Sequence, residues 1–580
     1  GGEYFARFLM YILRFNKLNN IFGKVSEKQG IEFIDEIIRF LEVTFEFDEN
    51  ELKRIPEQGA VITVSNHPFG GLDGILLIKI LTLARSDIKV LPNFLLRKIE
   101  PIADYFFADN PFVPEDGGQI DPKRVKPVSS HLESGGVLSI FPSGETSSYE
   151  TFMNFSDKQW QYPVIKFIKE AGVPVVPVYF QGSNSRLVNL IEKIYPAFRA
   201  NKLPTELLSR RNKTIRVRIG NPIRVADQEK FADTYHFGRY LRAKTYSMET
   251  RSKVEIKWFL NYPLKPGNKP EPIIEPMPKE VLLNEIQHIK NEFTLLKLKN
   301  YTIYCAPSKL IPNILNEIGR LREVTFREVG EGTNRSIDID EFDLYYHQMF
   351  IWDDDKERLV GAYRIGKGKE ILRMYGKRGF YFYTLFRANH QFTTVLNESL
   401  ELGRSFVIKE YQRQPMPLFL LWKGILYFLL KNPEYRYLIG PVSISNNYSK
   451  ISKDLIIKFI MANHFDWRKA VNIKPRNRYK FKSNNHNINI LMENMDQDIN
   501  KLDKCIGDLD ALNSGLPVLL KKYIKLNAKI IGFNVDPKFN NCLDGLIILD
   551  IFEVPKKVIE SLSKEANDGS ILDRFYSNRE

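Results

Sequence analysis

The sequence predicts a protein of two α/β domains joined by a proline-rich connector. At 580 residues the chain is longer than one hydrophobic core usually supports. Apolar residues make up 43% and aromatic residues 12% of the chain, which supports packed cores and excludes global disorder. Short apolar runs alternate with helical patterns, as is typical of helices layered on a sheet.

The connector is the clearest boundary along the chain. Six prolines fall within residues 262–279 and predict a stiff, extended, non-helical segment. The predicted parts of the chain are an amphipathic helix in 1–30, an N-terminal domain at 31–261, a linker at 262–284, a C-terminal domain at 285–565 and a polar tail at 566–580.

Each domain contains apolar runs with the length of strands. In the N-terminal domain the runs at 60–65, 137–142, 175–180 and 214–220 predict buried strands, and 73–85 and 162–171 predict helices. In the C-terminal domain the patterns predict a helix at 308–322, strands at 346–352 and 359–365, and a helix followed by a strand within 516–552.

Two segments interrupt this pattern. Residues 417–430 are apolar but too short to span a membrane, so they predict a buried helix or a mouth for lipid chains. The Asn- and Asp-rich residues 483–500 predict a loop or an ordered excursion.

The net charge of +14 favours an acidic partner, which is nucleic acid, anionic lipid or an acidic carrier protein. No repeat, zinc spacing or recognition-helix pattern indicates nucleic acid. We therefore expect an acyl carrier protein and a membrane surface as partners, and no nucleic acid. The basic stretch 474–482 is interpreted as a solvated strand or a docking patch for the carrier protein.

Residues 4–24 place apolar side chains largely along one helical face, with only positive charges among the ionised ones. This pattern fits an interfacial helix on anionic lipid, or a terminal helix docked on its own domain. The three cysteines lie far apart without metal-ligand spacing, which indicates a reducing compartment. We expect a bacterial cytoplasmic protein, peripheral on the inner face of the cytoplasmic membrane.

The first chemical motif, VSNHPFGGLDG, occupies 64–74 where a buried strand ends and a helix begins. A neutral His67 can take a proton from an attacking hydroxyl, and Asp73 can fix its tautomer and stabilise the imidazolium. Gly70 and Gly71 allow substrate to approach the backbone closely. In the alternative interpretation, His67 lies in a turn and Asp73 only caps the following helix.

Two later segments, FPSGETSS at 141–148 and GVPVVPVYFQGSNS at 172–185, follow this motif. In this order and spacing, residues 30–225 resemble the glycerolipid acyltransferase family. The resemblance implies that His67 is the general base and Asp73 its partner. It also implies an acceptor-binding block formed by Pro142, Ser143, Gly144 and Glu145.

The sequence departs from that family at two points. Five residues separate His67 from Asp73 instead of the usual four, and the block lacks the arginine that helps to hold a phosphate in the family. Without this bidentate clamp, an acceptor that carries phosphate is less favoured. The Gly-Gly-Leu-Asp-Gly variant is similar to the subgroup associated with amino-acid-containing lipids.

The second set of motifs includes GRLREVTFREVGEG at 319–332, DIDEFDLYYHQMFIWDDD at 338–355 and LELGRSFVIKEYQ at 400–412. Residues 295–555 resemble the N-acyltransferases of ornithine and glycine lipid synthesis, a branch of the GNAT superfamily near the acyl-homoserine-lactone synthases. An amine must be neutral to attack a thioester, so a base should lie close by. Glu401 is the predicted catalytic residue, and the resemblance implies that Glu401 and Arg404 help to hold donor and acceptor.

Further charged residues precede the predicted strand at 346–352. Arg322 pairs either with the acidic cluster or with a substrate carboxylate. Asp340, Asp343 and His347 shape the amine site in one interpretation and form a structural ion-pair network in the other.

The acyl donor and cofactors follow from motifs that the sequence lacks. The glycine-rich loop that holds the coenzyme A pyrophosphate in many GNAT enzymes is not evident, which favours acyl-acyl carrier protein over acyl-CoA as the donor. No residues have metal-ligand spacing, so we expect no bound metal or cofactor.

Two acyl transfers on one chain predict a bifunctional aminolipid synthase. The C-terminal domain would N-acylate ornithine or glycine with a 3-hydroxyacyl thioester, and the N-terminal domain would O-acylate the resulting hydroxyl. The alternatives are a lysophospholipid acyltransferase fused to a GNAT domain of separate purpose, and a lipid- or carrier-binding scaffold without activity. Signal synthesis of the homoserine-lactone kind is disfavoured because it needs no second acyltransferase.

Overall fold

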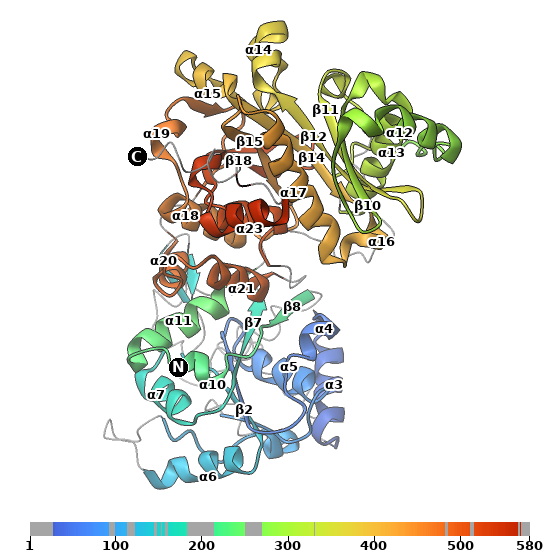
Figure 1. Cartoon of the computed structure of the whole chain (residues 1–580). Helices are drawn as coiled ribbons and strands as arrows, with labels where there is room; N and C mark the ends of the chain where they lie inside the picture. Colours follow the sequence, from blue (N-terminus) through green and yellow to red (C-terminus); the bar gives the residue numbers. More distant parts are fainter. Residues whose placement is uncertain are drawn as a thin grey trace, which may run out of the picture. The chain divides into compact units, whose positions relative to one another are not determined.

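The computed structural model (Figure 1) divides the chain into two compact units. Unit 1 comprises residues 1–251, 484–496 and 508–513, and unit 2 comprises residues 252–483, 497–507 and 514–580. The residues that the structure describes are 27–91, 99–112, 122–143, 148–151, 154–156, 160–181, 214–249, 270–329, 331–481, 485–510, 515–566 and 569.

Unit 1 is built on a six-stranded sheet with the strand order β1-β8-β7-β2-β4-β3. The central strand β2 is parallel to both β4 and β7, whereas β7 and β8 are antiparallel. The strands are β1 Thr44–Glu46, β2 Val61–Ser65, β3 Ile88–Val90, β4 Val137–Ile140, β7 Val175–Gln181 and β8 Thr214–Ile219. A separate hairpin is formed by β5 Ser148–Thr151 and β6 Asn154–Ser156.

Helices cover both faces of this sheet, which explains why its central strands β2, β4 and β7 are continuous apolar runs in the sequence. Val61 of β2 packs in one cluster with α3 and α5, whereas Ile62 and Val64 pack in another with α6, α7 and α11. The helices are α3 Gly30–Phe40, α4 Glu49–Leu52, α5 Gly71–Leu81, η2 Glu100–Tyr105, α6 Pro122–Glu133, α7 Tyr162–Glu170, α10 Val225–Gln228 and α11 Thr234–Ser247.

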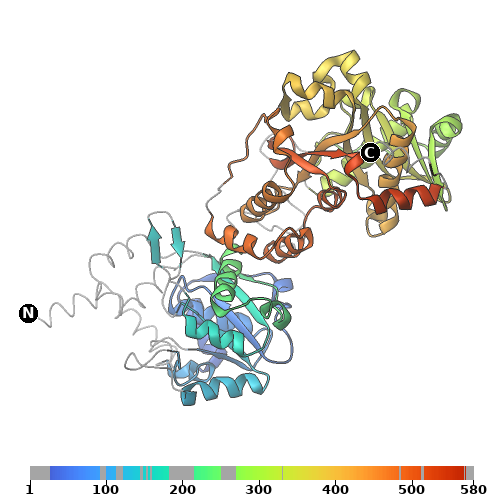
Figure 2. The ribbon, with the colours of Figure 1, turned by 60° about the vertical axis from the view of Figure 1, so that its left-hand side comes forward.

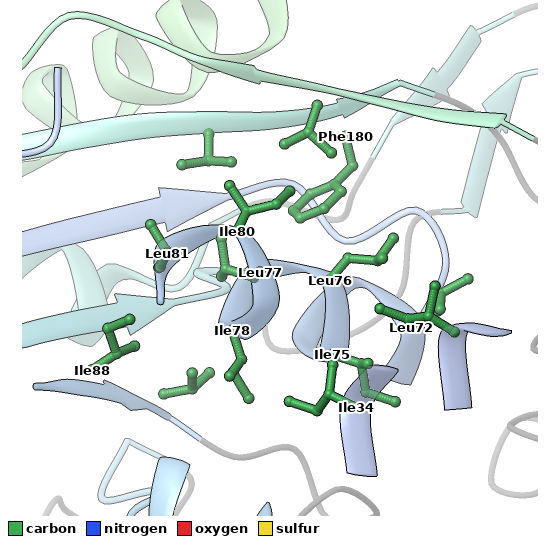
Figure 3. Packing of buried hydrophobic residues seen from close by; sticks show 14 of the residues in the cluster. Ile34, Leu72, Ile75, Leu76, Leu77, Ile78, Ile80, Leu81, Ile88 and Phe180 are labelled. Carbon is green, nitrogen blue, oxygen red and sulfur yellow. The ribbon is translucent and has the colours of Figure 1, made fainter. Parts of the chain in front are cut away.

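Helix α5 is the centre of the first cluster and directly follows the His67 motif. Its residues are buried from Gly71 to Ile78, and Leu76, Leu77 and Ile78 are each 0% exposed. Figure 3 shows these side chains among Ile34 of α3 and Phe180 of β7. This packing fixes the helix whose first turn carries Asp73.

Two segments from the C-terminal part of the chain complete unit 1. Helix α20, His486–Glu493, packs on α11, as both views show (Figures 1 and 2). Lys244 of α11 pairs with Asp508 at 2.7 Å, and both side chains are almost fully buried. The Asn- and Asp-rich region is therefore an ordered excursion, because Ile488, Ile490 and Leu491 give its helix a buried apolar face.

Unit 2 is built on an eight-stranded sheet with the order β17-β18-β15-β14-β12-β11-β10-β9. Neighbouring strands are antiparallel except β14 and β15, which are parallel. The strands are β9 Thr294–Leu298, β10 Tyr301–Pro307, β11 His347–Asp353, β12 Arg358–Lys367, β14 Ser399–Val407, β15 Tyr437–Ile444, β17 Lys529–Asp536 and β18 Cys542–Asp550. A small second sheet pairs β13 Phe386–Ala388 with β16 Ile473–Pro475.

Helices α13 and α17 lie on opposite faces of this sheet. Gly424 of α17 fits against Met349 and Ile303, whereas Arg322 of α13 joins a network on the face of Gln348, the neighbour of Met349. The segment at 417–430 is thus a buried helix. The other described helices are α12 Lys279–Phe293, α14 Gly368–Tyr375, α15 Thr393–Asn397, α16 Lys409–Gln412, α18 Lys450–Asn463, α19 Trp467–Ala470, α21 Ile499–Leu509, α22 Val518–Lys525 and α23 Lys556–Ala566, with α13 at Pro312–Glu328 and α17 at Pro415–Lys431. Short 3-10 helices are η4 Ser308–Leu310, η5 Glu341–Leu344, η6 Gly376–Gly379, η7 Tyr381–Thr384, η8 His390–Phe392 and η9 Ile551–Glu553.

The structure confirms the α/β class and the predicted strands, but the boundaries differ from the predicted ones. The predicted domains were continuous, whereas unit 1 also takes in residues 484–496 and 508–513. The predicted linker was to run to 284, but α12 begins at Lys279, directly after the last proline of that stretch. From Glu271 onward the linker is held by backbone hydrogen bonds to residues 334 and 336 of unit 2. The predicted helix at 4–24 and residues 571–580 of the predicted tail lie outside the described residues.

The buried Lys244–Asp508 pair gives a test of the excursion. Lys244→Ala should lower the free energy of unfolding by about 3 kcal/mol, because removing one partner leaves a buried charge uncompensated. Urea denaturation of the full chain measures it. The matched control is Lys230→Ala, whose pair with Asp227 is exposed, and which should change the value by less than about 0.5 kcal/mol. Equal effects of the two variants would contradict the structural role of the pair.

Candidate active sites

His67 and Asp73 are in direct contact at the carboxyl end of β2. Nδ1 of His67 lies 3.0 Å from Oδ2 of Asp73, and the two residues are 3% and 0% exposed. The N–H of Phe69 donates to the same carboxylate oxygen at 2.8 Å. With Nδ1 tied to the carboxylate, the histidine has the tautomer and orientation that a general base requires.

The five-residue spacing is accommodated by the turn between β2 and α5. Gly70 adopts φ 64°, a left-handed conformation that favours glycine, and is the N-cap of α5. The alternative interpretation of the motif requires Asp73 to be the N-cap, and the structure shows that it is not. It lies in the first turn of α5, where its negative charge is stabilised by the helix dipole and its side chain points back to His67.

Asn66, which the sequence reasoning did not select, fixes the end of β2. Its side-chain amide donates to the carbonyl of Phe180 at 2.9 Å, and its oxygen accepts from the N–H of Phe180 at 2.7 Å. This pair of bonds ties β2 to β7 immediately before His67. The only signal in the sequence is that an asparagine directly follows the apolar run at 60–65.

The block that follows β4 lies against the histidine. The ring of Phe141 packs against the His67 ring, with 4.4 Å between the ring centroids and a tilt of 34°, and the next two residues, Pro142 and Ser143, are buried. The structure thus brings part of the predicted acceptor block to the His67–Asp73 pair, with Gly70 and Gly71 at the turn. Gly144 and Glu145 lie outside the described residues.

A buried ionic network occupies unit 2 on the face covered by α13. Arg322, which is 0% exposed, donates to Asp338 and to Asp343, each at 2.8 Å. Arg364 of β12 lies 2.5 Å from Asp340 and 3.2 Å from Asp343. Burial would raise the pKa of Asp343, but the charges of Arg322 and Arg364 hold this pKa well below its ordinary value. Of the two predicted roles for Arg322, the structure shows pairing with the acidic cluster.

Glu401 lies on β14 beside this network. Its carboxylate accepts hydrogen bonds from the Tyr346 hydroxyl, from the N–H of Tyr381 at 2.9 Å and from the N–H of Phe382 at 2.6 Å. Burial raises the pKa of Glu401, against the effect of these three hydrogen bonds. The residue therefore anchors the 381–382 segment over the sheet, which is a positioning function that the sequence did not reveal.

Arg404 lies at a bulge of β14, where the register with β12 shifts, and adopts φ 52°. Its guanidinium is 3.2 Å from Asp338 and 3.3 Å from Asp340. It also lies over the rings of Tyr381 and Phe539, at 5.3 and 4.7 Å from their centroids. The bulge directs this side chain away from its strand and into the network.

β14 and β15 separate just beyond Glu401. They pair only from Ser399 to Glu401, although β14 continues to Val407 and β15 to Ile444. Leu402 and Gly440 still approach each other closely, since a Cβ on residue 440 would lie 2.1 Å from the carbonyl oxygen of Leu402. Arg404 on β14 and Ser443 on β15 thus belong to the diverging ends of the two strands.

His347 begins β11, near the ring of Phe428. Burial and the charges of Lys367 and Lys309 lower its pKa to about 4, so it is neutral near pH 7. Asp340 and Asp343 form a capping box on η5 and bind the arginines, as a structural ion-pair network would.

Sequence reasoning missed four residues that the fold adds to this site: Asp338, Arg364, Tyr346 and Tyr381. Arg364 is a charged residue within an apolar strand, which is the one signal that could have found it. Within the described part of the chain, no group of three or more His, Cys, Asp or Glu side chains could hold a metal ion. None of the described helices has the length and apolar character needed to cross a bilayer.

Comparison with known families gives a match for each half of the chain. Residues 2–253 match the family described as Acyltransferase, and residues 321–422 match the Acetyltransferase (GNAT) domain. The chain therefore joins an acyltransferase domain to a GNAT domain, and it is an enzyme that transfers acyl groups.

Some relatives have more specific names. The chain is 29% identical over 313 residues to the glycine N(alpha)-acyltransferase of Phocaeicola vulgatus, a match that covers 51% of this chain and 94% of the relative. It is 26% identical over 253 residues to the lyso-glycine lipid O-acyltransferase of the same organism, covering 42% of this chain and 88% of the relative. The corresponding N-acyltransferase of Bacteroides thetaiotaomicron is 27% identical over 304 residues, which are 49% of this chain and 87% of the relative. A solved acyl-homoserine lactone synthase is similar at 10% identity and a TM-score of 0.26, over 47% of this chain and 92% of that one.

The first test of these sites concerns Asp73. Asp73→Asn should lower the rate of acyl transfer by unit 1 on the order of 10² to 10⁴-fold, because the carboxylate no longer stabilises the imidazolium. The rate is measured with the purified full chain and an acyl thioester. Asp35→Asn is the control, since Asp35 pairs with Lys79 on α5 but is half exposed. A fully active Asp73→Asn variant would show that the contact with His67 is not used.

The second test concerns Glu401. Glu401→Gln should destabilise the protein by about 1–3 kcal/mol, because an amide offers one acceptor oxygen where Tyr381 and Phe382 each direct an N–H. Denaturation followed by circular dichroism measures this loss. Glu370→Gln, on the exposed side of α14, should leave stability unchanged, and an equally stable Glu401→Gln would contradict the anchoring function.

Proposed function

We propose that the chain is a bifunctional aminolipid synthase. Unit 2 joins a 3-hydroxyacyl group to the α-amine of an amino acid, and unit 1 then transfers a second acyl chain to the hydroxyl of that product. Glycine is the amino acid that the relatives favour over ornithine, since the matched N-acyltransferases are named for glycine.

The observation that carries this proposal is that one chain is similar both to N-acyltransferases and to O-acyltransferases of glycine lipids. The N-acyltransferase relatives and the O-acyltransferase relatives together account for two acyl transfers of one lipid. The N-acyltransferase match spans 313 residues and the O-acyltransferase match spans 253 residues, so each is about the size of one unit. One acyl transfer in each unit is consistent with these lengths.

The site of unit 1 supports a hydroxyl acceptor. His67, oriented by Asp73, is the base that takes the proton of the attacking hydroxyl, while the thioester carbon receives its oxygen. The arginine that holds phosphate in glycerolipid acyltransferases is absent from the block at 141–147. An acceptor with a carboxylate in place of a phosphate is compatible with this loss.

The net charge of +14 supports an acidic acyl carrier protein as donor and anionic lipid as the surface on which the enzyme works. The sequence of residues 4–24, with only basic ionised side chains, supports contact with the inner face of a bacterial membrane. Coenzyme A thioesters are the competing donors, and an assay with both carriers separates them.

The alternative function is a lysophospholipid acyltransferase fused to a GNAT domain of separate purpose. The match of residues 2–253 to the general acyltransferase family is the observation in its favour. It predicts new phospholipid species and no aminolipid.

Expression in a host without aminolipids, followed by lipid mass spectrometry, tests the proposal. The wild-type chain should yield a diacylated amino acid, and His67→Ala should accumulate the monoacyl intermediate, because only the second transfer loses its base.

The control for this experiment is His236→Ala. His236 is exposed and contacts its neighbours Asp233 and Tyr235, so this variant should make the diacyl product like the wild type. A diacyl product from His67→Ala would mean that His67 is not the base. New phospholipids without aminolipid would establish the alternative function.

A further inference from the structure

A group of acidic side chains lies on unit 2 next to the network already described. Asp544 of β18 is directly opposite Ser443 of β15, and the Ser443 hydroxyl donates to Oδ1 of Asp544 at 2.8 Å. Asp536 of β17 and Glu331, beyond the end of α13, add their charges to that of Asp544. These carboxylates belong to no function assigned above.

Asp544 faces the same side of the sheet as Tyr346 and Tyr381. Leu546 and Ile548, two and four residues farther along β18, pack in the cluster that contains Tyr346 and borders Tyr381. Because side chains alternate along a strand, Asp544 projects to that face too. Burial raises the pKa of Tyr381, the charges of Arg404 and Arg364 lower it, and the charges of Asp536 and Asp544 raise it further. The guanidinium groups of Arg364 and Arg404 lie over the Tyr381 ring, at 5.1 and 5.3 Å from its centroid, and the two aspartates are close enough for their charges to act on the same residue.

Several polar atoms in this region are buried without a partner among the residues that the structure describes. Oδ2 of Asp544, a residue only 2% exposed, accepts no hydrogen bond from any of them. Nε and Nη2 of Arg364 and Nε of Arg404 likewise donate none within the described chain. Buried polar atoms are almost always paired, so such a set of unpaired atoms of both signs indicates a ligand that carries both charges. A free amino acid, with its ammonium and carboxylate groups, is such a ligand.

The surroundings of Asp544 suit a proton acceptor. Burial raises the pKa of Asp544 to about 7, with Asp536 and Glu331 adding to the rise, while the hydrogen bonds from Ser443 and from the Cys542 thiol oppose it. Burial also raises the pKa values of Tyr346 and Tyr381, which lie on this face of the sheet. A base whose pKa lies near the working pH is the most effective. Ser443 is exposed, so the carboxylate lies close to solvent along the diverging ends of β14 and β15.

We propose that Oδ2 of Asp544 binds the α-ammonium group of the amino-acid substrate and accepts its proton, while Arg364 and Arg404 receive the carboxylate. This inference rests on the proposed N-acylation by unit 2. One proton passes from the ammonium to Asp544, and the nitrogen lone pair attacks the thioester carbon. The C–S bond then breaks, a second amine proton goes to the leaving thiolate, and Asp544 returns its proton to solvent.

The experiment compares wild type and Asp544→Asn in the full chain, with glycine and a 3-hydroxyacyl carrier-protein thioester, over a range of pH. In the wild type, kcat/KM for glycine should rise as pH increases through about 7 and then level off, because the base must be ionised. Asp544→Asn should reduce kcat on the order of 10² to 10⁴-fold at pH 8 and lose this rise.

Aminooxyacetic acid separates a chemical effect from a structural one. Its amine is neutral at pH 7 and needs no base, and it keeps the carboxylate. The ratio of variant to wild-type rate should therefore be at least ten times higher with aminooxyacetic acid than with glycine. A variant equally impaired with both nucleophiles would overturn the assignment of Asp544 as the base.

A matched control variant and a melting temperature accompany this comparison. Asp550→Asn changes another carboxylate of β18, which pairs with the half-exposed Arg436, and should keep wild-type N-acylation. A raised pKa means that the folded state loses stability as pH rises from about 4 through 7, and Asn removes this loss. Asp544→Asn should therefore melt at or above the wild-type temperature at pH 8.

Three further outcomes test the assignment of Asp544 as the base. An Asp544→Asn variant with wild-type kcat on glycine would sink the assignment and leave the proposed function standing. A variant that loses only ornithine, through a raised KM, would place the acidic group at a side-chain amine instead. A wild-type chain that makes no N-acyl amino acid would overturn the proposed function and this inference together.

Discussion

A charge inside either unit of this protein is stable only where an opposite charge or a set of hydrogen-bond donors meets it, because transfer of an ion from water into the interior costs several kcal/mol. In unit 2 this constraint determines where α13, β12 and the segment at 338–343 lie. Arg322 and Asp343, both 0% exposed, satisfy each other, and Arg364 reaches the same carboxylate. The bulge at Arg404 and the anchor at Glu401 are built on this fixed arrangement.

The two sites meet that constraint in different ways. In unit 1 the Asp73 carboxylate contacts the His67 imidazole and accepts from the backbone N–H of Phe69, so these contacts join neighbours in the sequence across one turn. In unit 2 the charges come from several strands, and some of their polar atoms have no partner among the described residues. The first arrangement suits a preformed proton acceptor for a hydroxyl. The second is suited to a small ion that completes the network when it binds.

This difference explains how much of each site could be predicted from sequence. His67 and Asp73 were found because one strand end, one turn and one helix start bring them together, and their separation in sequence is short. The sequence predicts Glu401, Arg322 and Arg404 as site residues, but their order in the chain does not reveal that Glu401 accepts hydrogen bonds from Tyr381 and Phe382. Asp544 lies more than a hundred residues beyond them and reads as one polar position in an apolar strand. Only the pairing of β15 with β18 brings it to the same face.

The α/β class was predictable because strands buried on both faces read as apolar runs. The excursion of α20 was not, because a short helix with three buried apolar residues has no signature that distinguishes it from a loop with scattered hydrophobic side chains. Its partner α11 lies more than two hundred residues earlier, and packing between them depends on the whole fold of unit 1.

That excursion also constrains how the protein is made. Unit 1 draws on residues 484–496 and 508–513, so its last pieces leave the ribosome only after most of unit 2 has been synthesised. At typical elongation rates of about 5–20 residues per second, the intervening chain takes roughly 10–50 s to appear. During that interval the nascent N-terminal half lacks α20 on the surface of α11. In Phocaeicola vulgatus the N-acyltransferase and O-acyltransferase relatives are two separate proteins. Here one chain contributes to both units and passes between them more than once. The ratio of the two units would therefore be fixed at one to one, and a single proteolytic cut would leave them joined.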